Sequence, residues 1–250
     1  MAFGREGSSF MIDMHTHVLC GVDDGARTME ESLALIRMDE EQGVRQIVAT
    51  PHYDPENSNQ REELLLALSR LREKAAEAGL QIQLEQGNEV LYFESMTTHL
   101  EQGRILTLGG SSYVLVEFYP TESWQAIQRA VRKLAAAGYR PVLAHVERYQ
   151  ALRSHDAAEL IESGAYLQIN AGSLEGGPFS QTAGFCKKLL RKGYVDFLGS
   201  DMHRSDTRPP RWKTAVKWIR THLPEAEADA LFSGNAADML RDIEICRACR

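Results

Sequence analysis

The sequence has few cysteines and no long apolar run, and each absence excludes a class of protein. Four cysteines in 250 residues are too few and too scattered for a disulfide framework, so we expect reduced thiols. No apolar run approaches the roughly 20 residues of a membrane helix, and the start of the chain lacks a signal peptide. We therefore expect a cytoplasmic protein without membrane insertion. The cysteines are Cys20, Cys186, Cys246 and Cys249, and we interpret the last two as part of a surface tail.

Positive charge is also scarce. Lysine and arginine number 28 against 35 acidic residues, which gives a net charge of −7. Nothing resembles a basic stripe, so nucleic acid is excluded as a first hypothesis. No glycine-rich dinucleotide or Walker-type loop follows the first apolar run, and nucleotide binding of those kinds has no support.

Short β-rich runs alternate with helix-period segments along the whole chain. This pattern is typical of repeated βα units around a parallel sheet, and its length suits one domain. We expect a seven-stranded barrel, one unit short of the common eight, with a doubly wound open sheet as the main rival. The expected strands are Phe10 to Val18, Gln46 to Thr50, Gln81 to Gln86, Tyr113 to Phe118, Pro141 to Val146, Tyr166 to Asn170 and Asp196 to Ser200.

The helical segments between these strands have clear ends. Several stop at a glycine just past the last periodic residue, as helix C-termini do. These are Gly43, Gly79, Gly138, Gly164 and Gly193. The segments are 29–42, 61–78, 123–137, 155–162 and 182–192, with one or two closing helices within 211–241 around Pro224.

Histidine and carboxylate side chains close six of the seven expected strands. In parallel α/β folds, chemistry collects where strands end. Residues two apart on a strand share a face, so His15 with His17, and Asp201 with His203, can each aim two donors at one point. Imidazole and carboxylate together suit Mn²⁺, Fe or Zn²⁺. The strand-end set, which predicts a site for several metal ions, is His15, His17, His52, Glu89, Glu117, His145, Asp201 and His203.

Each of these residues, taken alone, could have an ordinary structural role instead of binding metal. A lone strand-end histidine is usually a hydrogen-bonded core or surface residue, and Glu117 alone would be an ion-pair partner. His99, His155 and His222 lie on helix or loop stretches, and we expect them outside the site. The prediction therefore depends on the set.

Six motifs resemble one branch of the bacterial polymerase and histidinol phosphatase (PHP) superfamily, the manganese-dependent protein tyrosine phosphatases of capsule and exopolysaccharide loci. The similarity runs in order from about residue 11 to residue 210. It implies a phosphatase domain over 11–245, preceded by an extension or tag at 1–10. The motifs are MIDMHTHVLCGVDDGA from Met11, Ala49 to His52, Gly87 to Glu89, Leu115 to Phe118, Ala144 to Tyr149 and Ser200 to His203.

The resemblance implies a distorted seven-stranded (β/α)₇ barrel of the TIM type holding three metal ions, most simply Mn²⁺, with Fe or Zn²⁺ also possible. It adds Asp24 to the eight strand-end ligands; the ordinary alternative is a turn or helix-capping aspartate. It also implies that Arg148 and Arg208 bind the phosphate group of the substrate, whose oxygens a guanidinium fork can hold. Arg208 lies in a polar loop, where surface arginine is common.

The activity implied by the resemblance is hydrolysis of phosphotyrosine on a bacterial tyrosine autokinase by a metal-bound hydroxide, which would regulate capsular or exopolysaccharide synthesis. The nearest alternative is a small-molecule phosphomonoesterase such as a histidinol phosphatase, since the same ligands serve either leaving group. An amidohydrolase or a binding protein without turnover are more distant alternatives. The sequence leaves the oligomeric state open.

Overall fold

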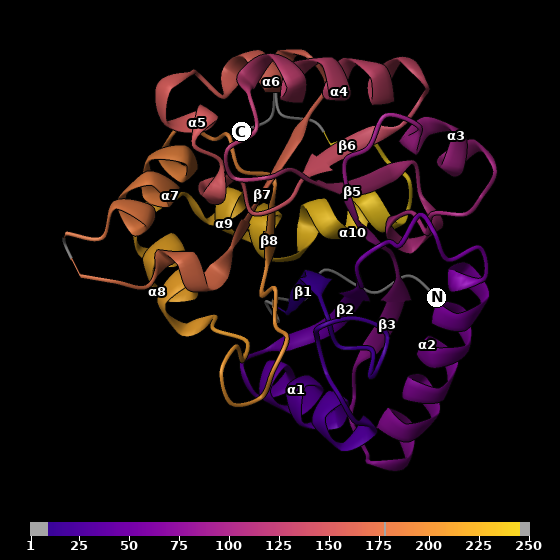
Figure 1. Cartoon of the computed structure of the whole chain (residues 1–250). Helices are drawn as coiled ribbons and strands as arrows, with labels where there is room; N and C mark the ends of the chain where they lie inside the picture. Colours follow the sequence, from indigo (N-terminus) through magenta and orange to yellow (C-terminus); the bar gives the residue numbers. More distant parts are fainter. Residues whose placement is uncertain (1–9, 178, 246–250) are drawn as a thin grey trace.

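The computed structural model describes residues 10–177 and 179–245. The expected extension at residues 1–10, apart from Phe10, and the pair Cys246 and Cys249 lie outside these residues. The described part is an α/β fold of parallel strands with helices around them (Figure 1).

The strands form two parallel sheets. The first has the order β1-β2-β3, with β1 at Met11–Thr16, β2 at Val44–Ala49 and β3 at Gln83–Gln86. The second runs from β4 to β8 in chain order. Its members are β4 at Glu89–Leu91, β5 at Tyr113–Glu117, β6 at Arg140–Leu143, β7 at Tyr166–Asn170 and β8 at Phe197–Gly199.

Isolated bridges join the two sheets at both edges. Thr16 pairs with Met202 beyond β8, and His52 beyond β2 pairs with Glu89 of β4. Backbone bonds reinforce both junctions, including Asp201 N–H to His15 O at 2.8 Å. The strands therefore surround a common centre, unlike those of a single open doubly wound sheet.

The expected count of seven strands is not confirmed, because the described residues form eight. The expected third strand, Gln81 to Gln86 with its end at Glu89, is interrupted at Gly87 and Asn88. Asn88 donates its side-chain amide to Pro51 O at 3.1 Å and accepts the N–H of Leu106 at 2.8 Å. These bonds hold the chain out of the ladder, so that Glu89 begins β4 instead of ending β3.

Most helices lie where the periodicity predicts them. Thr28, Ser123 and Ser180 each cap a helix by accepting a backbone N–H. The expected helix at 155–162 is present only as the shorter α6, with the short α5 just before it, and α3 was not predicted. The closing segment 211–241 holds the three helices α8, α9 and α10, where one or two were expected. Among the described residues no helix is long and apolar enough to cross a membrane. The helices are α1 Met29–Glu41, α2 Gln60–Glu77, α3 Met96–Glu101, α4 Trp124–Ala136, α5 Ala151–Ser154, α6 Ala158–Glu162, α7 Gln181–Arg191, α8 Lys213–His222, α9 Glu225–Asp229 and α10 Asn235–Leu240, with a π turn at Ala230–Gly234 and 3₁₀ turns at Leu108–Gly110, Val146–Arg148 and Ala171–Leu174.

All five predicted glycine stops have positive φ, from 66° at Gly193 to 101° at Gly164. A residue with a Cβ pays a steric cost in this conformation, which explains why glycine ends these helices.

Two apolar clusters lie on opposite faces of the strands. The larger fills the space between the strands and the outer helices. The smaller joins inward residues such as Met14 and Leu115 to Ala236 and Met239 of α10, which lies between the two sheets in Figure 1. Helix α10 therefore closes the inner side of the strands with apolar contacts.

Candidate metal centre

The structure brings all nine predicted metal ligands together. They fall into four overlapping groups, and within each group the donor atoms lie within 4.8 Å of one another. The groups are His17, Asp24, His52 and His203; His15, His145 and Asp201; His15, His17 and Glu89; and His52, Glu89 and Glu117.

His15 and His17 form the base of the site, with both side chains fully buried. The pairing register of β1 with β2 shifts between Asp13 and Thr16, a stretch that includes His15 and ends next to His17. The two Nε2 atoms are 3.3 Å apart. The Nδ1 atom of His17 lies 2.7 Å from Asp23 Oδ2, and that of His15 lies 3.3 Å from Gln168 Oε1. Since an oxygen acceptor holds each Nδ1–H, both Nε2 atoms present lone pairs to the centre.

Glu89 lies at the middle of the site and is 1% exposed. Its Oε2 is 3.3 Å from His15 Nε2, 3.2 Å from His17 Nε2 and 3.2 Å from His52 Nδ1. Its Oε1 is 2.8 Å from His145 Nε2, which in turn lies 3.3 Å from Glu117. One carboxylate thus contacts four imidazoles, belongs to two of the four groups and contacts members of the other two.

The buried carboxylates of the centre need positive charge close to them, which protonated imidazoles or metal ions can supply. Burial by itself would lower the pKa of His17, but the hydrogen bonds to Asp23 and Glu89 outweigh it and raise the pKa to about 10. Burial is likewise outweighed at His145, whose pKa Glu117 and Glu89 raise to about 9. If the imidazoles were neutral, the Nε2 lone pair of His15 would face the Nε2 atom of His17 and the Oε2 atom of Glu89, which are also hydrogen-bond acceptors, across about 3.3 Å. Divalent ions among these oxygen and nitrogen donors would satisfy them, so the residues fit a metal cluster.

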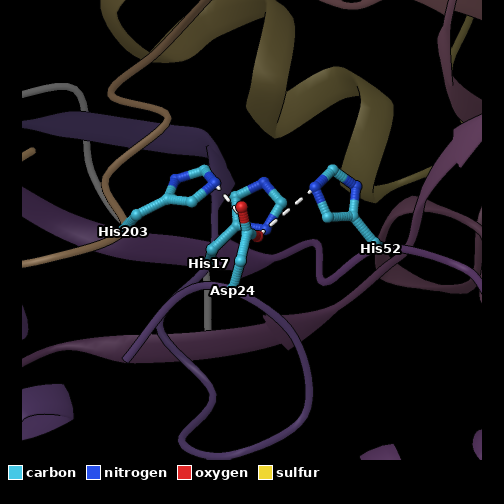
Figure 2. A group of neighbouring side chains, drawn as sticks. All are labelled: His17, Asp24, His52 and His203. Atoms are coloured by element: carbon cyan, nitrogen blue, oxygen red, sulfur yellow. Dashed lines mark ion pairs between the residues drawn. The ribbon is translucent and has the colours of Figure 1, made fainter. Parts of the chain in front are cut away.

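His17, Asp24, His52 and His203 lie together at one end of the site (Figure 2). Asp24, in the loop after β1, has Oδ1 3.5 Å from His52 Nε2 and 3.4 Å from His203 Nε2. Its side chain is 68% exposed, and that of His52 is 40% exposed. A large molecule can therefore reach this end.

Two of the site residues have unusual backbones. His145 has φ 31° and Asp201 has φ 54°, both in the left-handed region that residues other than glycine rarely adopt. Gln168 Oε1 accepts the N–H of His145 at 2.6 Å, and the N–H of Asp201 donates to His15 O. Such strain concentrates at functional sites, where the surrounding structure maintains it.

Both predicted arginines reach the same carboxylate. Arg148 Nη2 donates to Asp201 Oδ2 at 2.7 Å, and Arg208 Nη2 donates to the same oxygen. Burial would raise the pKa of Asp201, but the charges of His15 and Arg208 hold it well below its usual value. The side chains of the two arginines are 39% and 37% exposed, so they line the open part of the site.

Several supporting residues were not predicted. Asp23 accepts from the His17 ring and from the N–H of His52 at 3.1 Å, although its neighbour Asp24 was predicted as a ligand. Asn170 ends the only expected strand without a strong ligand, and its Nδ2 donates to Asp201 Oδ2 at 2.7 Å. The side chain of Gln168 joins the first and sixth predicted strands to this network. The sequence signal that could have identified Gln168 and Asn170 is their polar character at inward-facing positions of a strand.

Asp13 and Asp39 form a second buried acidic pair beneath the site. Asp13 Oδ1 accepts the N–H groups of His15 and Ser200, and Asp39 accepts from Trp212 Nε1 at 2.7 Å. Burial raises the pKa of Asp13 to about 6. The pair therefore joins β1, α1 and the end of β8 below the candidate ligands.

The remaining predictions about histidine and cysteine agree with the structure where it describes them. His155 stacks on Trp124 with ring centroids 4.6 Å apart, and His222 stacks on Trp218 at 4.5 Å. His99 lies 2.8 Å from the Tyr53 hydroxyl. None of the three belongs to the four groups, and Cys20 and Cys186 are free thiols.

Known proteins resemble this chain in both sequence and fold. The chain is 35% identical over 240 residues to a tyrosine-protein phosphatase CpsB of Streptococcus agalactiae, covering 93% of this chain and 99% of that one. A crystal structure from the pair YwqE of Bacillus subtilis and CpsB of Streptococcus pneumoniae, described as metal-dependent tyrosine phosphatases, matches with a TM-score of 0.87 and 28% identity over 94% of this chain and 96% of that one.

More distant structures show the fold alone. The histidinol phosphate phosphatase of Lactococcus lactis matches with a TM-score of 0.53 and 15% identity, covering 84% of this chain and 91% of that one.

The model of the family "capsular polysaccharide synthesis, CpsB/CapC" matches residues 11–241, which confirms the resemblance found in the motifs. The chain belongs to the CpsB/CapC family of capsular polysaccharide synthesis proteins.

Proposed function

We propose that this protein is a metal-dependent protein-tyrosine phosphatase. The observation that carries the proposal is the set of nine histidine and carboxylate residues whose donor atoms form four overlapping groups, with two partly exposed arginines bound to Asp201. The S. agalactiae relative is named a tyrosine-protein phosphatase, and that match spans nearly the full length of both chains.

We assign the nine residues as ligands of three Mn²⁺ ions, although Fe or Zn²⁺ would accept the same donors. When bound, the ions would supply positive charge and lower the pKa of a bound water toward neutrality. Gln168 and Asp23 orient the imidazoles of His15 and His17 so that their Nε2 atoms face the ions. The ligands are His15, His17, Asp24, His52, Glu89, Glu117, His145, Asp201 and His203.

Arg148 and Arg208 hold the phosphoryl group in this proposal. Their guanidinium groups now share one oxygen of Asp201 and are more than a third exposed. A phosphate dianion offers them further oxygens, and their planar forks can stabilise the charge that builds on these oxygens during transfer. Tyrosine leaves with a pKa of roughly 10, so it needs less help from a general acid than an alkyl alcohol does.

The open end of the site favours a protein substrate. Asp24 and His52 are accessible, as a phosphotyrosine carried on a polypeptide requires. We propose that the substrate is a phosphotyrosine segment of a bacterial tyrosine kinase in the cytoplasm, and that its hydrolysis regulates capsule synthesis. We further propose that residues 11–245 form one domain and that β3 and β4 are halves of one strand of a seven-stranded barrel.

Side-by-side kinetics test the choice of substrate. We expect kcat/KM for a phosphotyrosine peptide to exceed that for histidinol phosphate by about a hundredfold, because the aryl leaving group is better and the site is open. Both reactions would be measured with Mn²⁺ at the same pH. Preference for histidinol phosphate would instead support a small-molecule phosphatase.

Asp23 offers a test of how the imidazoles are oriented. In Asp23→Asn the side chain keeps its size but loses the charge that stabilises the His17 Nδ1–H, and its amide can present a donor to that ring. We expect metal affinity and kcat to fall by about 10- to 100-fold. Metal titration with turnover would measure this, and Asp229→Asn, which changes an exposed carboxylate on α9 outside the four groups, is the matched control. Unchanged metal affinity in Asp23→Asn would refute the positioning role.

A further inference from the structure

A hollow of about 470 Å³ lies beside the candidate metal centre. One wall includes Gly21 and Val22, from the loop that carries Asp24. Asp54 and Asn57, from the segment after His52, contribute a second wall. The N-terminal part of α2 completes it, so the two loops that supply ligands at the open end also border this hollow.

Gln60 connects the hollow to the site. Its side chain is 6% exposed and lines the hollow. Its Nε2 donates to His52 O at 2.7 Å, and its Oε1 accepts the N–H of Asp54 at 2.9 Å. A molecule seated here therefore lies against the same chain segment that positions His52.

The lining combines apolar surface with negative charge. Leu66 is 59% exposed although it is a large apolar residue on α2, and Val22 lies across from this helix in the lining. Asp54 accepts the N–H of Glu56, and Glu63 accepts the amide of Asn57, both at 2.9 Å. Both of these hydrogen bonds come from uncharged donors. Arg70 also lines the hollow, so the carboxylates outnumber the guanidinium.

We propose that this hollow binds the residues flanking the phosphotyrosine of a peptide substrate, with an apolar side chain on Leu66 and a lysine or arginine facing Asp54 and Glu63. The proposal rests on the proposed phosphatase function and adds its substrate preference. Its basis is continuity with the open end of the site and the complementarity of a basic residue to the two carboxylates.

The test compares two substrates in the full-length, metal-loaded protein. One is a phosphotyrosine peptide with leucine and lysine on both sides of the phosphotyrosine, and the other is phenyl phosphate, which has no flanking residues. In Leu66→Arg the apolar contact is lost and the new charge repels lysine. We expect the ratio of kcat/KM for the peptide to that for phenyl phosphate to fall about tenfold, mainly through the KM of the peptide.

Ser69→Arg is the matched control, because it adds the same charge to an exposed position of α2 outside the lining. It should leave the ratio within about twofold of the wild type, as surface changes usually do. The proposal is overturned if Leu66→Arg also leaves the ratio unchanged, or if both variants lower it equally.

A second measurement needs no variant. Replacing the two lysines of the peptide by glutamates should lower kcat/KM in the wild-type protein by about tenfold, because like charges would meet at Asp54 and Glu63. Equal rates on the two peptides would refute the hollow as a peptide site and leave the phosphatase function standing. If the wild-type protein hydrolyses neither the peptides nor phenyl phosphate, the phosphatase function itself fails.

Discussion

Glu89→Gln should lower kcat for phosphotyrosine hydrolysis by about a thousandfold or more, since it removes a buried charge that several ligands share. The two oxygens of Glu89 face four imidazoles, one through Oε1 and three through Oε2. An amide has one oxygen and one NH₂ group, so either orientation points a group without a lone pair at the ligand cluster. The variant would therefore hold metal ions less well than the carboxylate.

The same geometry predicts a loss of stability in the metal-free protein. The Glu89 carboxylate helps to raise the pKa of His17 to about 10 and that of His145 to about 9, so it stabilises protonated imidazoles when no ion is bound. Metal-free Glu89→Gln should thus melt below the metal-free wild-type protein, in addition to binding less metal. Metal analysis and thermal unfolding measure the two effects, and Glu94→Gln, with an 87% exposed side chain, is the control. Wild-type turnover with wild-type metal content in Glu89→Gln would refute the central role of this carboxylate.

The parts of the fold encoded by nearby residues could be predicted from the sequence. The five glycine stops depend on the conformation of single residues, and the capped helices depend on one serine or threonine each. The break between β3 and β4 could not be predicted, because it depends on contacts of Asn88 with Pro51 and Leu106, which lie far along the chain. Helix α3 has only six residues and no side-chain cap, so its local signal is weak.

The candidate site likewise has a part that the sequence predicts and a part that it does not. His15 and His17 converge as their spacing predicts, and the resemblance placed Asp24 among them. Spacing cannot tell Asp23 from Asp24, since two adjacent carboxylates in a loop differ only in the direction the folded loop gives them. Nor could the sequence show that Arg148, Arg208 and Asn170 meet on one oxygen of Asp201, because these residues come from three different segments.

Removal of metal should abolish phosphotyrosine hydrolysis, and Mn²⁺ should restore it. Without ions, buried carboxylates such as Glu89 and Asp201 have only protonated imidazoles such as His17 and the arginines to balance their charge, so the folded state also loses stability. A metal present at a thousand times its Kd contributes about 4 kcal/mol, which corresponds to roughly 10 °C in Tm for a domain of this size. Dialysis against a chelator, followed by activity and calorimetry with and without Mn²⁺, measures both losses.

The cysteines provide the decisive control for this experiment. A cysteine nucleophile would survive chelation, whereas a metal site needs no thiol. With Cys20, Cys186, Cys246 and Cys249 all replaced, the Mn²⁺-loaded protein should therefore retain most of its hydrolysis of phenyl phosphate. Burial raises the pKa of the Cys186 thiol, which keeps it protonated and a poor nucleophile. Activity that persists after complete metal removal, or that disappears in a folded cysteine-free variant, would exclude the metal-dependent mechanism.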